Sequence, residues 1–243
     1  MELIENLEDY MHEFFGYGNL NSKIWFIGHE EGSVQNSVSE LHERVKTWNK
    51  LGKGTLCDCK DFHMLLKMGN EKPFTKGSPQ RTWWRYLDIL FLYSKRYVLD
   101  KELKRKFIKN EFAKLDSNHA LLELFPIPCS NIPSWTYNTL EKQLDYFSSK
   151  EKYSNEVFKK RLSKILELIN KHKPKCIIFS GTTALSSWQN IAGNEFKKIT
   201  IGDNYYYFLK GDINYFVIPK LIYNSNAIIN SVADDVRQIM KKI

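Results

Sequence analysis

The chain has 243 residues, of which 42% are hydrophobic and 26% are charged, so it is long enough to bury a substantial core. No stretch approaches 18 consecutive apolar residues, so we expect no membrane span, and the N-terminus lacks the pattern of a secretory signal. The aromatic content of 14% excludes a disordered chain. We therefore expect a globular, cytoplasmic protein.

The charge balance is basic, with 36 Lys and Arg against 28 Asp and Glu, for a net charge of +8. A basic surface favours polyanionic partners, because contacts with phosphates release counterions. The four cysteines, Cys57, Cys59, Cys129 and Cys176, lack the spacing of zinc or redox pairs. We expect no metal and no cofactor.

Short apolar runs predict buried strands at residues 24–27, 120–125, 176–179 and 215–218. The first three are continuous rather than alternating, which is typical of strands covered on both faces by helices. The fourth can pair with residues 205–208 across a turn at 210–212.

Apolar stripes at helical spacing predict helices between these strands. The stripes are Trp83, Leu87, Leu90 and Phe91; Leu103, Phe107 and Phe112; Phe158, Leu162, Ile165, Leu166 and Ile169; and Ile229, Val232, Val236 and Ile239. Alternating strands and helices predict an α/β fold, a three-layer α/β/α sandwich with a central, mostly parallel four-stranded sheet. We expect a single domain over residues 1–243, with a helical insertion around 33–118.

In such sheets, ligands bind beyond the carboxyl ends of the strands. The first strand is followed by Gly28-His29-Glu30-Glu31-Gly32. A carboxylate held there is well placed to orient a water or to stabilise a cation. The alternative is a glycine turn with charges that face solvent.

The second strand contains Glu123 in an otherwise apolar run. A buried charge is costly unless it is paired or functional. Glu123 therefore either forms a buried ion pair with a Lys or Arg or accepts hydrogen bonds from a ligand.

The last two strands also end in polar segments. Ser180-Gly181-Thr182-Thr183 has the pattern of a turn into a helix whose free N–H groups bind phosphate, or of a turn formed for packing alone. Residues 219–226 combine a cation with apolar and small polar groups, which suits a loop that grips DNA and wedges a base stack. The alternative is an ordinary loop with a helix cap.

Together these segments resemble, in order over about residues 20–240, the uracil-DNA glycosylase superfamily. The resemblance implies a compact α/β enzyme that flips a base out of DNA and cleaves its glycosidic bond. Glu30 stands where founding members carry the Asp that serves the attacking water, and His29 stands where other branches carry Glu. Glu31 replaces the family's Pro, so either Glu30 or Glu31 is the expected catalytic acid.

Glu123 stands where the family carries an Asn that reads the uracil edge. An ionised carboxylate only accepts hydrogen bonds, so it suits the exocyclic amine of cytosine and repels a uracil carbonyl. Lys220-Leu221-Ile222 replaces the family's His-Pro-Ser, and Lys220 is the expected cation for the departing base.

The resemblance also implies roles for further residues. We expect substrate contacts from Gly28, Glu123, Phe74 and Asn131, with Trp83 as an alternative stacking residue to Phe74. We expect DNA contacts from Ser180, Thr182, Thr183, Lys220, Leu221, Ile222, Tyr223, Asn224 and Ser225.

The resulting hypothesis is a monomeric DNA glycosylase that leaves an abasic site. Its substrate is a modified cytosine such as glucosylated hydroxymethylcytosine in phage DNA, because divergent members of the superfamily include phage-defence enzymes. The alternatives are a non-catalytic DNA-binding module, a uracil-specific glycosylase, and an N-glycosidase for free nucleosides or nucleotides.

Overall fold

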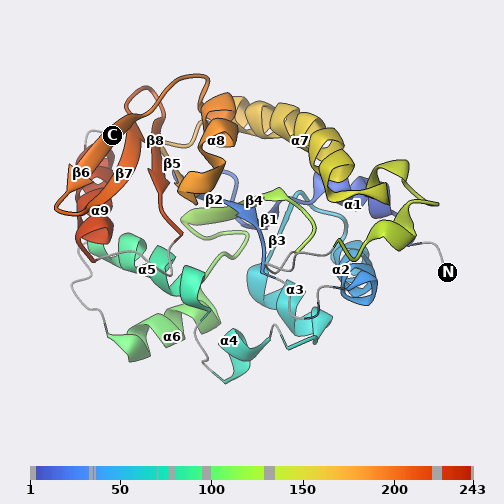
Figure 1. The fold of residues 1–243 in the computed structure, drawn as a ribbon. Helices are drawn as coiled ribbons and strands as arrows, with labels where there is room; N and C mark the ends of the chain where they lie inside the picture. Colours follow the sequence, from blue (N-terminus) through green and yellow to red (C-terminus); the bar gives the residue numbers. More distant parts are fainter. Residues whose placement is uncertain are drawn as a thin grey trace.

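A mixed sheet of eight strands runs through the described part of the chain (Figure 1). The computed structural model describes residues 4–32, 35, 37–69, 71–76, 80–94, 100–128, 135–220 and 226–241. The strands are β1 (Gly16–Gly18), β2 (Ile24–Glu30), β3 (Leu56–Cys57), β4 (His119–Phe125), β5 (Cys176–Ser180), β6 (Lys197–Ile201), β7 (Asn204–Leu209) and β8 (Asn214–Ile218). Their order across the sheet is β3-β1-β4-β2-β5-β8-β7-β6.

The four strands predicted from apolar runs are confirmed as β2, β4, β5 and β8. They lie side by side in the order β4-β2-β5-β8, and each neighbouring pair is parallel. The predicted pairing of residues 205–208 with the last strand is also confirmed, since β7 and β8 are antiparallel.

The expectation that the sheet has only four strands is wrong. β1 and β3 extend one edge, where β1 is antiparallel to β4, and the β6–β7 hairpin extends the other. β1 has three residues and β3 has two, so neither is long enough to show a hydrophobic period. The physical result is a wider, mixed sheet.

Helices pack on both sides of this sheet. They are α1 (Leu7–Glu13), α2 (Val38–Lys50), α3 (Cys59–Leu66), α4 (Lys72–Thr75), α5 (Arg81–Tyr93), α6 (Lys101–Asn110), α7 (Lys150–His172), α8 (Leu185–Ala192) and α9 (Asn226–Met240). Short 3₁₀ turns are η1 (Asn138–Leu140), η2 (Asp145–Ser148) and η3 (Thr182–Ala184). In Figure 1, α7 and α8 lie on one side of the sheet and α5 on the other.

Contacts between elements agree with this arrangement. α7 packs against β4, α1 and α8, whereas α5 packs against α9, and α9 packs against β7. The segment between β2 and β4 holds α2 to α6 and also the edge strand β3. Within the described ranges, no helix combines the length and the apolar character that crossing a bilayer requires.

The apolar stripes predict which helix faces are buried, with two exceptions. Leu103 of α6 is 36% exposed. Ile165 and Ile169 of α7 are buried, but Leu166 is 41% exposed. The buried face of α7 is instead completed by Val157 and Arg161. A charged residue therefore occupies a core position that the apolar pattern alone does not reveal.

Arg161, on α7, binds backbone carbonyls from two other parts of the fold. Its guanidinium donates to the carbonyls of Leu124 and Glu123 on β4 and to those of Met11 and Phe14 at the end of α1. The guanidinium also lies 3.8 Å from the centroid of the Phe15 ring. Burial lowers the pKa of Arg161 to about 10, so the side chain remains charged at neutral pH.

We predict that Arg161→Met lowers the free energy of unfolding by about 3 kcal/mol or more, because several buried carbonyls lose their donor. Methionine retains the apolar stem, so packing alone changes little. Chemical denaturation monitored by circular dichroism measures the effect. Lys159→Met, at an exposed position on the same helix, is the control and is expected to change stability by less than about 0.5 kcal/mol. Equal stabilities of the two variants would refute the role assigned to Arg161.

Candidate active site

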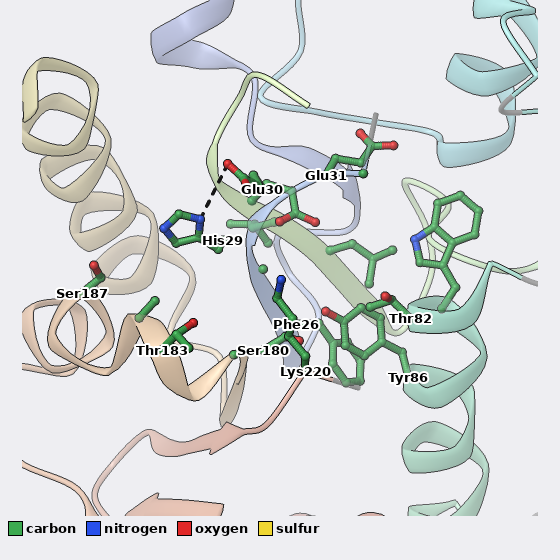
Figure 2. A pocket seen from close by; sticks show the side chains of 18 of the residues that line it. Phe26, His29, Glu30, Glu31, Thr82, Tyr86, Ser180, Thr183, Ser187 and Lys220 are labelled. Carbon is green, nitrogen blue, oxygen red and sulfur yellow. Dashed lines mark ion pairs between the residues drawn. The ribbon is translucent and has the colours of Figure 1, made fainter. Parts of the chain in front are cut away.

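A cavity of about 690 Å³ opens toward the carboxyl ends of the parallel strands (Figure 2). Its walls come from β2, β4, the first turns of α5, the β5–α8 connection and Lys220, which follows β8. Ligands bind at this edge of open α/β sheets. The volume lies within the range of roughly 300–1,000 Å³ that is typical of sites enclosing small organic ligands.

Glu123 lies against Gly28 in the cavity. The two residues are directly paired in the β2–β4 register. A Cβ atom at position 28 would lie 2.1 Å from Glu123 Oε2, so the carboxyl occupies the space that any other residue would fill. Glycine is required here for close approach of a side chain rather than for an unusual backbone angle.

The Glu123 carboxyl has an unusual electrostatic environment. Burial raises its pKa well above the ordinary value, and the nearby Glu31 and Glu30 carboxylates raise it further. Its Oε2 atom has no hydrogen-bond partner within the described residues. Arg161 binds the backbone carbonyl of Glu123, not its carboxylate. The neutral acid is therefore favoured, in contrast to the ionised carboxylate that the sequence reasoning assumed.

Glu31 is the opposite case, because it is held by donors. Its carboxylate accepts hydrogen bonds from Tyr17 Oη at 3.0 Å and from Arg44 Nη1 at 2.9 Å. His63 Nε2 lies 3.6 Å from the other oxygen of Glu31. Although burial opposes it, the Arg44 guanidinium lowers the pKa of Glu31, so this residue stays ionised. Arg44 is itself held by Glu40 at 3.2 Å.

Glu30 is the freer of the two neighbouring carboxylates. Its side chain is 26% exposed, and Oε2 lies 3.8 Å from His29 Nδ1, the contact marked in Figure 2. Burial raises the pKa of Glu30, and the positive charges of Lys150 and Lys220 partly oppose that rise. Burial also lowers the pKa of His29, so the imidazole beside Glu30 is neutral at neutral pH.

Aromatic rings form one wall of the cavity. The Phe26 and Tyr86 rings lie 4.2 Å apart between centroids, and Tyr86 shares a hydrogen bond with Ser180. Trp83, one turn before Tyr86 on α5, also lines the cavity. A planar heterocycle placed against this wall would meet ring faces and edges.

Another part of the lining is rich in hydroxyl groups. Ser180 ends β5, Thr183 lies in η3, and Ser186 and Ser187 lie in the first turn of α8. Lys220 also lines it and lies near enough to lower the pKa values of both Glu30 and His29. The cavity therefore combines acids, one cation, hydroxyls and an aromatic wall.

The cavity brings together nine residues that the sequence singled out. They are Gly28, His29, Glu30, Glu31, Trp83, Glu123, Ser180, Thr183 and Lys220. Two others lie elsewhere. Thr182 belongs to η3 but does not line the cavity, and Phe74 is buried behind Trp83, with 5.7 Å between the ring centroids. Trp83 rather than Phe74 thus offers a ring to a ligand.

Several predicted residues lie outside the described ranges. They are Asn131, Leu221, Ile222, Tyr223, Asn224 and Ser225. Within the described ranges, no three His, Cys, Asp or Glu side chains are grouped as metal ligands would be.

The sequence reasoning missed the residues that set the charge of the site. Arg44 and His63 come from α2 and α3, where nothing in the local pattern distinguishes them. Tyr86 had a detectable signal, because it lies three residues after Trp83 on the apolar stripe of α5. Tyr17 lies in a strand of three residues that the sequence did not predict.

Comparison with known proteins adds no relative, since no protein-family model and no curated protein matches the chain.

We predict that Gly28→Ala lowers the free energy of unfolding by about 1–3 kcal/mol, since the new methyl group displaces the Glu123 carboxyl. In the Glu123→Ala background this loss should shrink, and a double-mutant cycle of denaturation midpoints measures the coupling. Gly32→Ala is the control, because no atom lies within 4 Å of the position its Cβ would take. Additive effects of the two substitutions would show that the carboxyl does not occupy this space.

We predict that Glu123→Gln becomes progressively more stable than the wild type as the pH rises from about 4 to 7. The raised pKa means that the native state holds this proton more tightly than the unfolded state, so the wild type loses stability as the pH rises. Glutamine carries no proton to lose. Urea denaturation across this pH range measures the difference.

Glu31→Gln is the matched contrast. Because the pKa of Glu31 is lowered in the native state, the stability that its carboxylate contributes is present above the unfolded pKa and is lost as the pH falls. The free energy of unfolding of the wild type should therefore increase relative to that of Glu31→Gln as the pH rises. Two variants with the same pH dependence would contradict the assignment of different charge states to the two acids.

Proposed function

We propose that the protein is a DNA glycosylase that draws a flipped pyrimidine into the cavity and hydrolyses its glycosidic bond. The observation that carries the proposal is the buried Glu123 carboxyl, which lines the cavity with aromatic rings and a second, ionisable carboxylate. Its Oε2 atom has no hydrogen-bond partner within the described residues, and its raised pKa favours the neutral form. Flipped bases are read by hydrogen bonds along the Watson–Crick edge and by stacking on aromatic rings. The resemblance to uracil-DNA glycosylases supports the same function.

A neutral Glu123 changes the logic of base reading. A protonated carboxyl group has one O–H donor and one carbonyl acceptor. It can donate to N3 of cytosine while it accepts from the exocyclic amine. With the roles of its oxygens reversed, it also complements uracil, so Glu123 alone does not exclude that base.

The other walls of the cavity support a modified cytosine as the substrate. The volume of about 690 Å³ leaves room for a substituent beside the ring. The four hydroxyls of Ser180, Thr183, Ser186 and Ser187 offer hydrogen bonds to a polar substituent such as a sugar. Glucosylated hydroxymethylcytosine fits this combination, and removal of such a base from phage DNA would be a defence activity.

In the proposed reaction, the two neighbouring carboxylates have different tasks. Glu30, with its raised pKa, takes a proton from water as the water attacks the anomeric carbon. The C–N bond breaks, and its electrons leave with the base. Glu31, kept ionised by Arg44, supplies a fixed negative charge to the cationic sugar in the transition state. Lys220 supplies a positive charge to the departing base.

The test is excision from matched duplexes carrying cytosine, uracil, hydroxymethylcytosine or glucosylated hydroxymethylcytosine, with abasic sites revealed by alkali. We predict cleavage at a modified cytosine and a loss of about 10²-fold or more in single-turnover rate for Glu30→Gln. The rate of the wild type should rise with pH through the raised pKa of Glu30, because the base must be ionised.

The controls separate the remaining functions. Ser187→Ala, which removes one hydroxyl of the cavity, should weaken discrimination for the glucosylated base without removing activity on the others. Excision confined to uracil would show that uracil, rather than a modified cytosine, is the substrate. Turnover of free nucleosides, or DNA binding with no excision from any duplex, would reject the proposal.

A further inference from the structure

A second, smaller hollow lies between α4 and α6, on the lower side of the view in Figure 1. Its volume is about 450 Å³. Its charged lining residues are Lys76, Arg105, Lys106, Lys109 and Glu102. We call this hollow the α4–α6 groove.

The positive charge of the α4–α6 groove is largely uncompensated. Glu102 lies 3.9 Å from Arg105, and both side chains are exposed. Within the described ranges, no carboxylate lies at ion-pair distance from Lys76, Lys106 or Lys109. Four cations therefore face one acid.

Some exposed lysines elsewhere in the described residues do lie close to carboxylates. On α7, Lys160 lies between Glu8 and Glu156, and Lys164 lies between Glu13 and Glu167. The groove differs from these sites because several cations gather around one hollow with a single acid.

The groove and the cavity share an aromatic partition. Phe74 lines the groove, Trp83 lines the cavity, and the two rings are in contact. The groove therefore lies behind the wall against which a base would be placed. Among the described residues, none lines both the groove and the cavity.

We propose that the α4–α6 groove binds backbone phosphates of the DNA whose base enters the cavity. This inference rests on the proposed glycosylase function. Lys109 lies three residues after Lys106 and four residues after Arg105 on α6, so its side chain emerges about 5–6 Å from each of theirs. Successive phosphates of one strand suit such a row of cations, and their contact releases counterions.

The composition of the groove favours phosphates over an acidic protein. Protein partners are anchored by exposed aromatic or apolar side chains that enter pockets. Phe74, the aromatic residue among the described residues of the groove, is only 2% exposed. The other residues that line the groove are short, polar or charged. The groove thus offers charge without an apolar anchor.

The test is the salt dependence of binding to a 20-base-pair duplex, measured by fluorescence anisotropy for full-length wild type and Lys106→Gln/Lys109→Gln. Losing two phosphate contacts should reduce the slope of log affinity against log salt by about 1.8. Lys159→Gln/Lys171→Gln is the control, because it removes the same net charge from exposed positions on α7. The control should keep the slope of the wild type.

The rate of excision at saturating enzyme separates this proposal from the proposed function. The groove variant should retain the single-turnover rate of the wild type, because its substitutions lie outside the cavity. A slope equal to that of the control overturns the groove proposal even if excision is observed. A reduced slope together with no excision by the wild type supports the groove and rejects the glycosylase. Binding by the wild type that does not depend on salt overturns the groove proposal.

Discussion

The position of β4 depends on a buried arginine that has no carboxylate partner at hydrogen-bond distance in the described residues. In place of a salt bridge, the Arg161 guanidinium donates hydrogen bonds to backbone carbonyls of β4 and of the end of α1. A charge satisfied by several fixed dipoles is desolvated at less cost than one left bare. The carbonyl of Glu123 is among these acceptors, so the same contact that joins α7 to the sheet fixes the residue at the base of the cavity.

Three acids in one cavity then acquire different properties from their surroundings alone. Glu31 faces Arg44 and Tyr17 and is held ionised, whereas Glu123 faces glycine and other acids and is held neutral. Glu30 lies between these cases, with burial opposed by two lysines. Carboxyl groups whose pKa values are driven apart in this way are suited to separate acid, base and electrostatic tasks. The contacts of each carboxyl group, rather than its residue type, therefore determine its pKa in this cavity.

The sequence was sufficient to predict features that depend on local patterns, and it failed for features that depend on contacts between distant segments. Continuous apolar runs predict β2, β4, β5 and β8, and the strand-end rule brings Gly28, Glu30 and Lys220 to one edge. β1 and β3 were not predicted, because strands this short show no hydrophobic period. The raised pKa of Glu123 could not be read from the sequence, because burial and neighbouring acids are properties of the assembled fold. Arg44 controls Glu31 across 13 residues of sequence, and no spacing rule links the two.

The segment between β2 and β4 supplies what distinguishes this cavity. Its helices bring Arg44 to Glu31, and they bring Trp83 and Tyr86 to the aromatic wall. The same segment carries the cations of the α4–α6 groove. The strands alone would present carboxylates to open solvent, where their pKa values would stay ordinary. Enclosure by these helices creates the low-dielectric surroundings in which the pKa values of Glu123 and Glu30 are both raised. The segment is therefore an integral part of the site and not an appendage to the sheet.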